Sequence, residues 1–331
     1  MNHRAWICNE LCDDFSGLRL EQRPRLPCAA GEVRVRVHAA ALNFPDLLMT
    51  QGKYQHRPPL PFVAGMECAG EVVEVGDDVS WPAVGDAVCF GAHAGAFTEE
   101  LVAPAPVLRP VPKGFTMAEG AAYGVAALTA WVALVRRGAL QRGETLLVHG
   151  ASGGTGLAAV QLGLHLGATV IATGSSTQKL AAARELGAQH VLVVQPGAGE
   201  LSDAVKSLTG GRGADVVFDP VGGDLFDASV HCTAWGGRLL VVGFANGRIA
   251  SVPSNLPLIK GFSVVGVRAG EYGRHFPAHH AEHLAAVHRL AETGVLRPSI
   301  GARFPLAQAK DALAAMARRE VTGKIVVTIG T

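Results

Sequence analysis

The fold is decided by the stretch Glu144-Thr-Leu-Leu-Val-His-Gly-Ala-Ser-Gly-Gly-Thr-Gly156, which is followed by Leu157–Leu166. Leu146–Val148 form a short apolar run, as a buried strand of a parallel sheet does. A glycine turn comes next, and the following ten residues carry apolar side chains at helical spacing. A turn of this kind binds pyrophosphate through backbone N–H groups at the start of the helix. The residues that we expect to hold a nucleotide there are Gly150, Ser152, Gly153, Gly154, Thr155 and Gly156. The alternative is a glycine-rich turn without a ligand.

The end of the second strand indicates which nucleotide is bound. This strand, Ala168–Thr173, is followed by Gly174-Ser-Ser-Thr-Gln-Lys179, and no acidic residue occurs before Glu185. NAD-binding units usually place Asp or Glu here to hold the ribose 2′-hydroxyl. Ser175 and Lys179 instead suit a 2′-phosphate, which a carboxylate would repel. We therefore predict NADPH rather than NADH, the alternative for Lys179 being a solvated lysine in the first turn of a helix.

Composition excludes several classes of protein. The chain has 331 residues, enough for two domains, and 49% of them are hydrophobic. The net charge of +1 without a basic run indicates that no nucleic-acid partner is required. The sequence has neither a signal peptide nor an uninterrupted apolar stretch of membrane-spanning length, so no membrane partner is expected. Six cysteines without C-x-x-C pairs are typical of a reducing compartment, which favours a cytoplasmic location.

The first part of the chain, residues 1–122, is β-rich. Alternating or apolar runs predict strands at 31–38, 69–76 and 84–90. Prolines at four positions between 104 and 112 exclude a continuous helix or a central strand there. Two stretches between the strands look less structural, Asn43–Asp46 with Tyr54, and Gly65–Gly70.

The second part, residues 123–266, alternates strands with helices. An alanine-rich helix over 118–134 leads into it, and the glycine-turn unit begins a series of six parallel strands. This pattern predicts an α/β fold with a doubly wound sheet. The last part, residues 267–331, has two helical segments and a final strand at 323–329. We expect this tail to return to the first domain and to complete it.

The whole chain resembles the NADPH:quinone oxidoreductase branch of the medium-chain dehydrogenase/reductase superfamily. The resemblance implies a GroES-like β domain, a Rossmann domain that binds NADPH, and transfer of hydride to a small electrophile such as a quinone. The motifs that carry it are Asn43-x-x-Asp46, Tyr54, Pro61-Phe-Val-Ala-Gly-Met-Glu67-x-x-Gly70, Thr129-Ala-Trp131, the turn Gly150–Gly156, Asp219-Pro-Val-Gly-Gly223 and Thr322-Gly-Lys324.

The resemblance also implies roles for single residues. Asn43, Asp46, Tyr54 and Thr129 would form the catalytic group. The nicotinamide would contact backbone near Gly243-Phe244 and at Val265 and Val267, and Arg319 would help to bind the 2′-phosphate. The simpler readings are a capped turn at Asn43 and Asp46 and an aromatic lid at Tyr54. For Glu67 we expect a role in ordering its loop rather than in acid catalysis.

Departures from zinc-dependent relatives predict a protein without a metal. Those relatives carry a Gly-His-Glu motif and a catalytic cysteine, whereas this chain has Met66 at the histidine position and Asn43 near the cysteine position. A thioether and an amide do not make a tetrahedral zinc site. His279 and His283 have the helical spacing of a metal pair, but no acid or cysteine nearby completes a site.

Three functions follow from these features. The first is reduction of quinones or similar electrophiles, which take hydride without an activating metal. The second is reduction of an α,β-unsaturated ketone or thioester. The third is nucleotide binding with vestigial activity, since Leu48 replaces a second active-site tyrosine of the family. Val194 replaces a family tyrosine near the 2′-phosphate, so the prediction of NADPH rests on Ser175 and Lys179, with Arg319 as the helper that the family implies. The family also implies a homodimer formed through the outer strand Ser263–Val267.

Overall fold

The computed structural model describes residues 2–195 and 197–330. The chain divides into two compact units, which are described separately: Met1–Val125 with Pro298–Thr331, and Ala126–Arg297. The expectation of a β-rich domain and a doubly wound α/β domain is confirmed, because the two units have separate sheets and separate cores.

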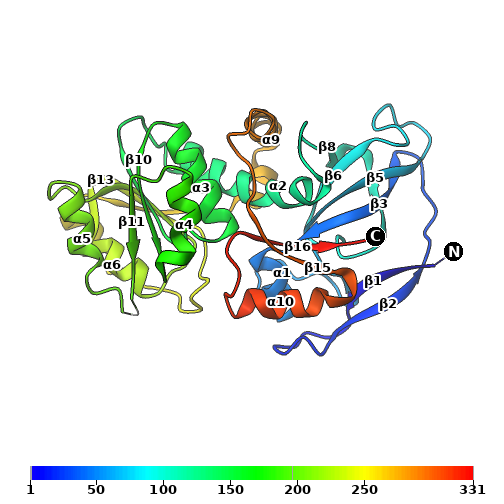
Figure 1. Cartoon of the computed structure of the whole chain (residues 1–331), viewed down its shortest axis with the longest axis horizontal. Coiled ribbons are helices and arrows are strands. Elements are labelled where there is room, and N and C mark those ends of the chain that lie inside the picture. The colour runs from blue at the N-terminus through cyan, green and yellow to red at the C-terminus, as the bar shows by residue number, and fades with distance from the viewer. Residues whose placement is uncertain (1, 196, 331) are drawn as a thin grey trace. The chain divides into compact units, whose positions relative to one another are not determined.

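The second unit contains a six-stranded sheet in which every neighbouring pair is parallel. Its strand order is β11-β10-β9-β12-β13-β14, so the order reverses between β9 and β12, as in a doubly wound sheet. The sheet is visible edge-on in the green and yellow part of Figure 1. Its strands are β9 (Thr145–Val148), β10 (Thr169–Gly174), β11 (His190–Val193), β12 (Ala214–Asp219), β13 (Thr233–Val241) and β14 (Ser263–Gly266).

Helices cover both faces of this sheet (Figure 1). The helices α3 (Gly154–His165) and α4 (Thr177–Glu185) contact each other, and α5 (Leu201–Leu208) contacts α6 (Asp224–Cys232). The unit also holds the end of α2 (Met117–Trp131), from Ala126 onward, together with the π-helical turn η2 (Val132–Arg137), α7 (Asn255–Lys260), α8 (Ala269–His275) and α9 (Pro277–Glu292). Central strand residues such as Leu147, Ile171 and Val217 are fully buried, which explains their unbroken apolar runs.

The first unit holds two sheets. A three-stranded sheet has the order β2-β1-β4, and a seven-stranded sheet has the order β15-β16-β3-β5-β6-β8 with β7 paired to β3. The strands are β1 (Asn2–Cys8), β2 (Leu18–Pro24), β3 (Glu32–Ala41), β4 (Phe62–Val63), β5 (Glu67–Val75), β6 (Ala87–Gly91), β7 (Glu100–Pro104), β8 (Leu108–Pro110), β15 (Ile300–Pro305) and β16 (Lys324–Thr328). The helical segments are α1 (Phe44–Thr50), α10 (Ala309–Ala317) and the 3₁₀ turns η1 (Ala105–Val107) and η3 (Leu306–Gln308).

The C-terminal tail returns to the first unit, but it does so later than residue 267. β16 pairs with β3, and the Trp6 indole N–H donates to the carbonyl oxygen of Leu306 at 2.6 Å. Residues 267–297 instead stay with the second unit. There the Arg136 Nε donates to His283 Nε2 at 2.6 Å, and Gln161 Nε2 donates to the carbonyl oxygen of Arg297 at 2.8 Å. These contacts move the boundary to Pro298.

The helical segment Met117–Arg137 is 21 residues long and apolar enough to cross a membrane by length and composition. Slightly more than half of the segment is buried within the protein, and its alanines at 121, 122 and 126 are among the most buried residues. A core helix has the same composition, so the segment is weak evidence for a membrane span.

Candidate functional site

The glycine turn after β9 has the geometry of a phosphate-binding turn. Gly150 has φ +59°, a conformation that favours glycine. A Cβ at Gly156 would lie 2.2 Å from the carbonyl oxygen of Gly150, so no side chain fits there without moving the turn. The helix α3 begins directly after Gly153, and the N–H groups of its first turn, at residues 154–156, have no partner within the helix. Such groups attract an anion.

The end of β10 lies beside this turn. The backbone N–H of Ala151 donates to the carbonyl oxygen of Thr173 at 3.0 Å, which joins the turn to the second strand. Ser175 is exposed just beyond β10, and Lys179 is partly buried in the first turn of α4. Ser176, which the sequence analysis did not single out, caps α4 by accepting a bond from the backbone N–H of Lys179 at 3.2 Å.

The residues expected near the nicotinamide follow two other strands of the same sheet. Gly243 and Phe244 come after β13, and Val265 and Val267 lie at the end of β14 and just beyond it. Because all six strands are parallel, these residues lie beyond the carboxyl ends of the strands, as the glycine turn does. The second unit therefore gathers its predicted nucleotide-binding residues at the carboxyl ends of its strands.

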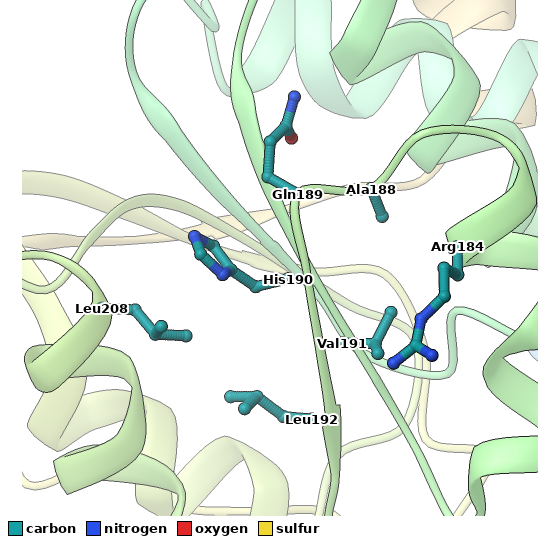
Figure 2. Close-up of a pocket in the computed structure, with 7 residues that line it drawn as sticks. All are labelled: Arg184, Ala188, Gln189, His190, Val191, Leu192 and Leu208. Atoms are coloured by element: carbon teal, nitrogen blue, oxygen red, sulfur yellow. The ribbon is translucent and has the colours of Figure 1, made fainter.

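A shallow hollow of about 500 Å³ elsewhere in this unit contains none of these residues. Figure 2 shows its lining, in which His190 and Leu192 extend to one side of β11 and Val191 to the other. Since β11 is one of the two edge strands, the hollow lies along an exposed side of the sheet and is not an enclosed cavity. It is not a candidate for the functional site.

The first unit contains a buried polar network around Glu67. Glu67 Oε1 accepts from Lys324 Nζ at 2.8 Å and from Asn43 Nδ2 at 2.9 Å, and its Oε2 accepts from the backbone N–H of Val125 at 2.9 Å. Lys324 Nζ also donates to Asn43 Oδ1 at 2.7 Å and to the carbonyl oxygen of Leu42 at 2.9 Å. These contacts join β5, β16 and the start of α1.

Asp46 lies next to this network and caps α1. Its Oδ2 accepts from the backbone N–H of Asn43 at 2.7 Å, as expected for an acidic residue in the first turn of a helix. The side chain is 1% exposed, and its Oδ1 has no hydrogen-bond partner among the described residues. Burial raises the pKa of Asp46 to about 7, opposed by the backbone of Asn43 and the charge of Lys324.

The other predicted catalytic residues occupy different places. Tyr54 follows α1 and packs, partly buried, against the core of the first unit together with Leu48 and Met66. Thr129 lies partly buried on α2 in the second unit. Arg319 is exposed after α10, with φ +56°. The structure thus brings Asn43 and Asp46 into contact, while the catalytic roles of all these residues stay predictions.

Sequence reasoning missed Lys324 as a member of the buried network. The residue was noted only within the Thr-Gly-Lys motif, and Glu67 was expected to order its loop. One signal was present in the sequence, because a lysine at the start of a predicted apolar strand needs a buried acceptor. Its partner Glu67 is far away along the chain, and pattern reasoning does not identify such a pair.

Comparison with known proteins agrees with this architecture. Residues 29–113 match the alcohol dehydrogenase GroES-like domain, and residues 154–286 match the zinc-binding dehydrogenase family. Quinone oxidoreductase-like protein 2 of Mus musculus is 38% identical over 99% of this chain and 93% of its own length. The quinone oxidoreductase of Thermus thermophilus, solved also in complex with NADPH, is 32% identical, with a TM-score of 0.85 over 98% of this chain and 100% of its own.

A third relative has a different context. Component PikAII of the pikromycin polyketide synthase of Streptomyces venezuelae is 36% identical over 92% of this chain, although the match spans only 8% of that protein.

The residues around Glu67 do not fit the zinc that the matched family name implies. Both carboxylate oxygens of Glu67 are engaged by the network, and the neighbouring positions offer the Met66 thioether and the Asn43 amide. Zinc requires a tetrahedral set of thiolate, imidazole or carboxylate ligands. Among the residues that the structure describes, no three His, Cys, Asp or Glu side chains are grouped to hold a metal ion.

Proposed function

From the premise that this chain belongs to the quinone oxidoreductase-like branch of the medium-chain dehydrogenase/reductase superfamily, we propose that it is a zinc-free, NADPH-dependent reductase of quinones or similar electrophiles. The observation that carries the proposal is the Lys324–Glu67–Asn43 network. An ion pair and an amide occupy the region in which zinc ligands would be needed. An acceptor that takes hydride readily needs no Lewis acid.

The choice of NADPH rests on the second unit. The glycine turn and the first turn of α3 suit a pyrophosphate, and Ser175 and Lys179 suit the additional 2′-phosphate. Arg319 is proposed as a further cation for that phosphate. The Thermus thermophilus relative was solved with NADPH, which supports the same cofactor here. When bound, NADPH supplies the hydride.

The chain's own residues would then orient the acceptor and manage its charge. Hydride transfer leaves negative charge on an oxygen of the acceptor, and fixed donors stabilise such charge. We assign this role to Asn43, Tyr54 and Thr129. Asp46, whose buried carboxyl has its pKa raised to about 7 and is therefore partly protonated at neutral pH, is proposed to supply a proton to the reduced oxygen.

The second candidate function is reduction of a C=C bond conjugated to a ketone or thioester. It is favoured by the similarity to part of a polyketide synthase component. The chemistry asked of the protein is the same, because hydride addition to such a bond also places negative charge on a carbonyl oxygen. The acceptor that is turned over faster decides between the two.

We also propose that the protein is a homodimer in the cytoplasm. β14 is an edge strand, so the backbone groups on its outer side are available to a second copy. Apolar side chains are exposed near it, with Trp235 and Leu258 each 79% exposed and Ile259 66% exposed. The Trp235 ring lies over Gly261, which places it next to the end of α7. Apolar exposure beside an open edge is typical of an interface.

The test is NADPH oxidation followed at 340 nm with a small 1,4-quinone, with a conjugated enone, and with NADH in place of NADPH. Rapid turnover of the quinone that requires NADPH is expected. Faster turnover of the enone would favour the second function. Equal use of NADH would contradict the argument from Ser175 and Lys179. Tight NADPH binding without turnover of either acceptor would leave the vestigial nucleotide-binding protein as the correct reading.

A further inference from the structure

Lys324 is a buried cation whose hydrogen bonds are all used inside the protein. Its side chain is 5% exposed. An ammonium group has three N–H donors and no acceptor. The three acceptors around it are the carbonyl oxygen of Leu42, Asn43 Oδ1 and Glu67 Oε1, at 2.7 to 2.9 Å. Lys324 is therefore held in one place, and it determines how its neighbours are oriented.

This donor set fixes the orientation of the Asn43 carboxamide. Because Lys324 only donates, the atom of Asn43 that faces it must be the oxygen Oδ1. The nitrogen Nδ2 then faces Glu67 Oε1 at 2.9 Å, which uses one of its two N–H bonds. The remaining contact of Nδ2, to the carbonyl oxygen of Ala41, is 3.5 Å long, at the limit of a hydrogen bond. One N–H of Asn43 is thus left without a strong acceptor.

We propose that Lys324 is a positioning residue, which fixes the Asn43 carboxamide so that its second Nδ2–H is presented to the acceptor oxygen. The proposal rests on the reductase function argued above and adds to it a residue that does not itself touch the acceptor. Lys324 also polarises the amide, since a positive charge at 2.7 Å from Oδ1 draws electrons from Nδ2 and strengthens its N–H as a donor.

Glu67 keeps this arrangement stable in a dry environment. Its charge balances that of Lys324 at 2.8 Å, and the backbone N–H of Val125 holds its other oxygen. A buried ion pair of this kind adds little net stability but specifies geometry when each hydrogen-bonding group is matched. The pairing of β16 with β3 completes the sheet of the first unit, and it also brings Lys324 next to Asn43.

A double-mutant cycle on kcat tests the proposal. The variants are Lys324→Met, Asn43→Ala and the two combined, with Lys324→Arg as the conservative replacement. A preorganised donor contributes about 100-fold to kcat in comparable sites, so Lys324→Met is expected to lower kcat about 10- to 100-fold. The Kd for NADPH should stay within about twofold, and Lys324→Arg should restore part of the loss.

The cycle separates positioning from general damage. If Lys324 acts through Asn43, adding Lys324→Met to Asn43→Ala lowers kcat by less than about twofold. Additive losses, or an unchanged kcat in Lys324→Met, would overturn the proposal. Should Lys324→Met not fold because Glu67 is left unpaired, the variant Glu67→Gln/Lys324→Met removes both charges and replaces it in the cycle.

A measurement that does not depend on turnover distinguishes failure of this inference from failure of the proposed function. In protein labelled with ¹⁵N-asparagine, the two Nδ2 protons of Asn43 should differ, with the one bonded to Glu67 exchanging slowly with solvent. Lys324→Met should shift both signals and remove that protection. If the wild-type protein reduces no acceptor, the proposed function fails, yet unchanged Asn43 signals in Lys324→Met would separately refute the positioning role.

Discussion

The buried carboxyl of Asp46 should make the stability of this protein depend on pH. Replacing Asp46 with Asn keeps an oxygen that accepts the N–H of Asn43 and removes the ionisable group. The folded state holds the pKa at about 7 because the carboxyl is buried, against an ordinary value of 3.8. A group whose pKa is raised on folding stabilises the folded state below its unfolded pKa, and this contribution is lost as pH rises through the folded pKa.

The size of the effect follows from these two values. At pH 5 the unfolded chain is already ionised at this position while the folded protein keeps the proton. Between pH 5 and pH 7 the folded state therefore loses about 1.4 kcal/mol per pH unit from this group, and the loss levels off above pH 7. Over pH 5 to 8 the wild-type protein should lose about 2–3 kcal/mol that the Asp46→Asn variant does not lose.

Urea unfolding, followed by tryptophan fluorescence at pH 5 and pH 8, measures this difference. The unfolding free energy of Asp46→Asn minus that of the wild type should rise by about 2–3 kcal/mol between the two pH values. Effects of the substitution that do not depend on pH cancel in this comparison. Asp203→Asn, an exposed position on α5, supplies the baseline. A difference that stays constant within error would refute the reasoning from burial.

Three further predictions concern the nucleotide and the interface. Gly156→Ala should abolish NADPH binding in a fluorescence titration, because the new Cβ would lie 2.2 Å from a backbone oxygen. The control Gly199→Ala, whose new Cβ would have no atom within 4 Å, should bind NADPH normally. Lys179→Ala should raise the KM for NADPH about tenfold and leave the KM for NADH nearly unchanged, and equal changes in both would contradict its role at the 2′-phosphate. Leu258→Asp should convert the proposed dimer to a monomer in light scattering. The control Leu26→Asp, at an exposed position on the other unit, should leave the dimer intact, and a monomeric wild-type protein would refute the interface.

Sequence patterns predicted the second unit well, because its signals are local. The strand expected at 168–173 is β10, and the glycine turn after β9 leads into α3 as expected. β13 was harder to delimit from sequence, and it begins at Thr233. The pairing register of β13 is irregular around Gly236, where φ is +75°. In the sequence, the adjacent glycines at 236 and 237 suggest a turn rather than a continuous strand.

The first unit was predicted less completely, because its pairings are distant in the chain. β15, which the sequence patterns did not predict, alternates half-buried and exposed residues, with Gly301 and Arg303 at exposed positions. The strand forms because it pairs with β16. The helix α1 was expected only as a capped turn at Asn43 and Asp46, and the capping bond exists, but a seven-residue helix follows it.

The buried network shows why the site was only partly accessible from sequence. Asn43 and Asp46 were identified through a motif, and their proximity follows from helical spacing. The contact between Lys324 and Glu67 depends on the C-terminal strand pairing with β3, a long-range event that no local pattern encodes. Motifs therefore identified residues, whereas the structure showed which of them share charge and hydrogen bonds.

The claim at the centre of this account is that hydride transfer needs NADPH and an activated acceptor but no metal. The most direct test is turnover of a 1,4-quinone by protein dialysed against a strong chelator, with metal content measured by mass spectrometry on the same sample. The account predicts undiminished kcat at less than about 0.05 zinc per chain, because the residues around Glu67 leave no ligand set for it. Activity that disappears on chelation and returns in proportion to added zinc would contradict it.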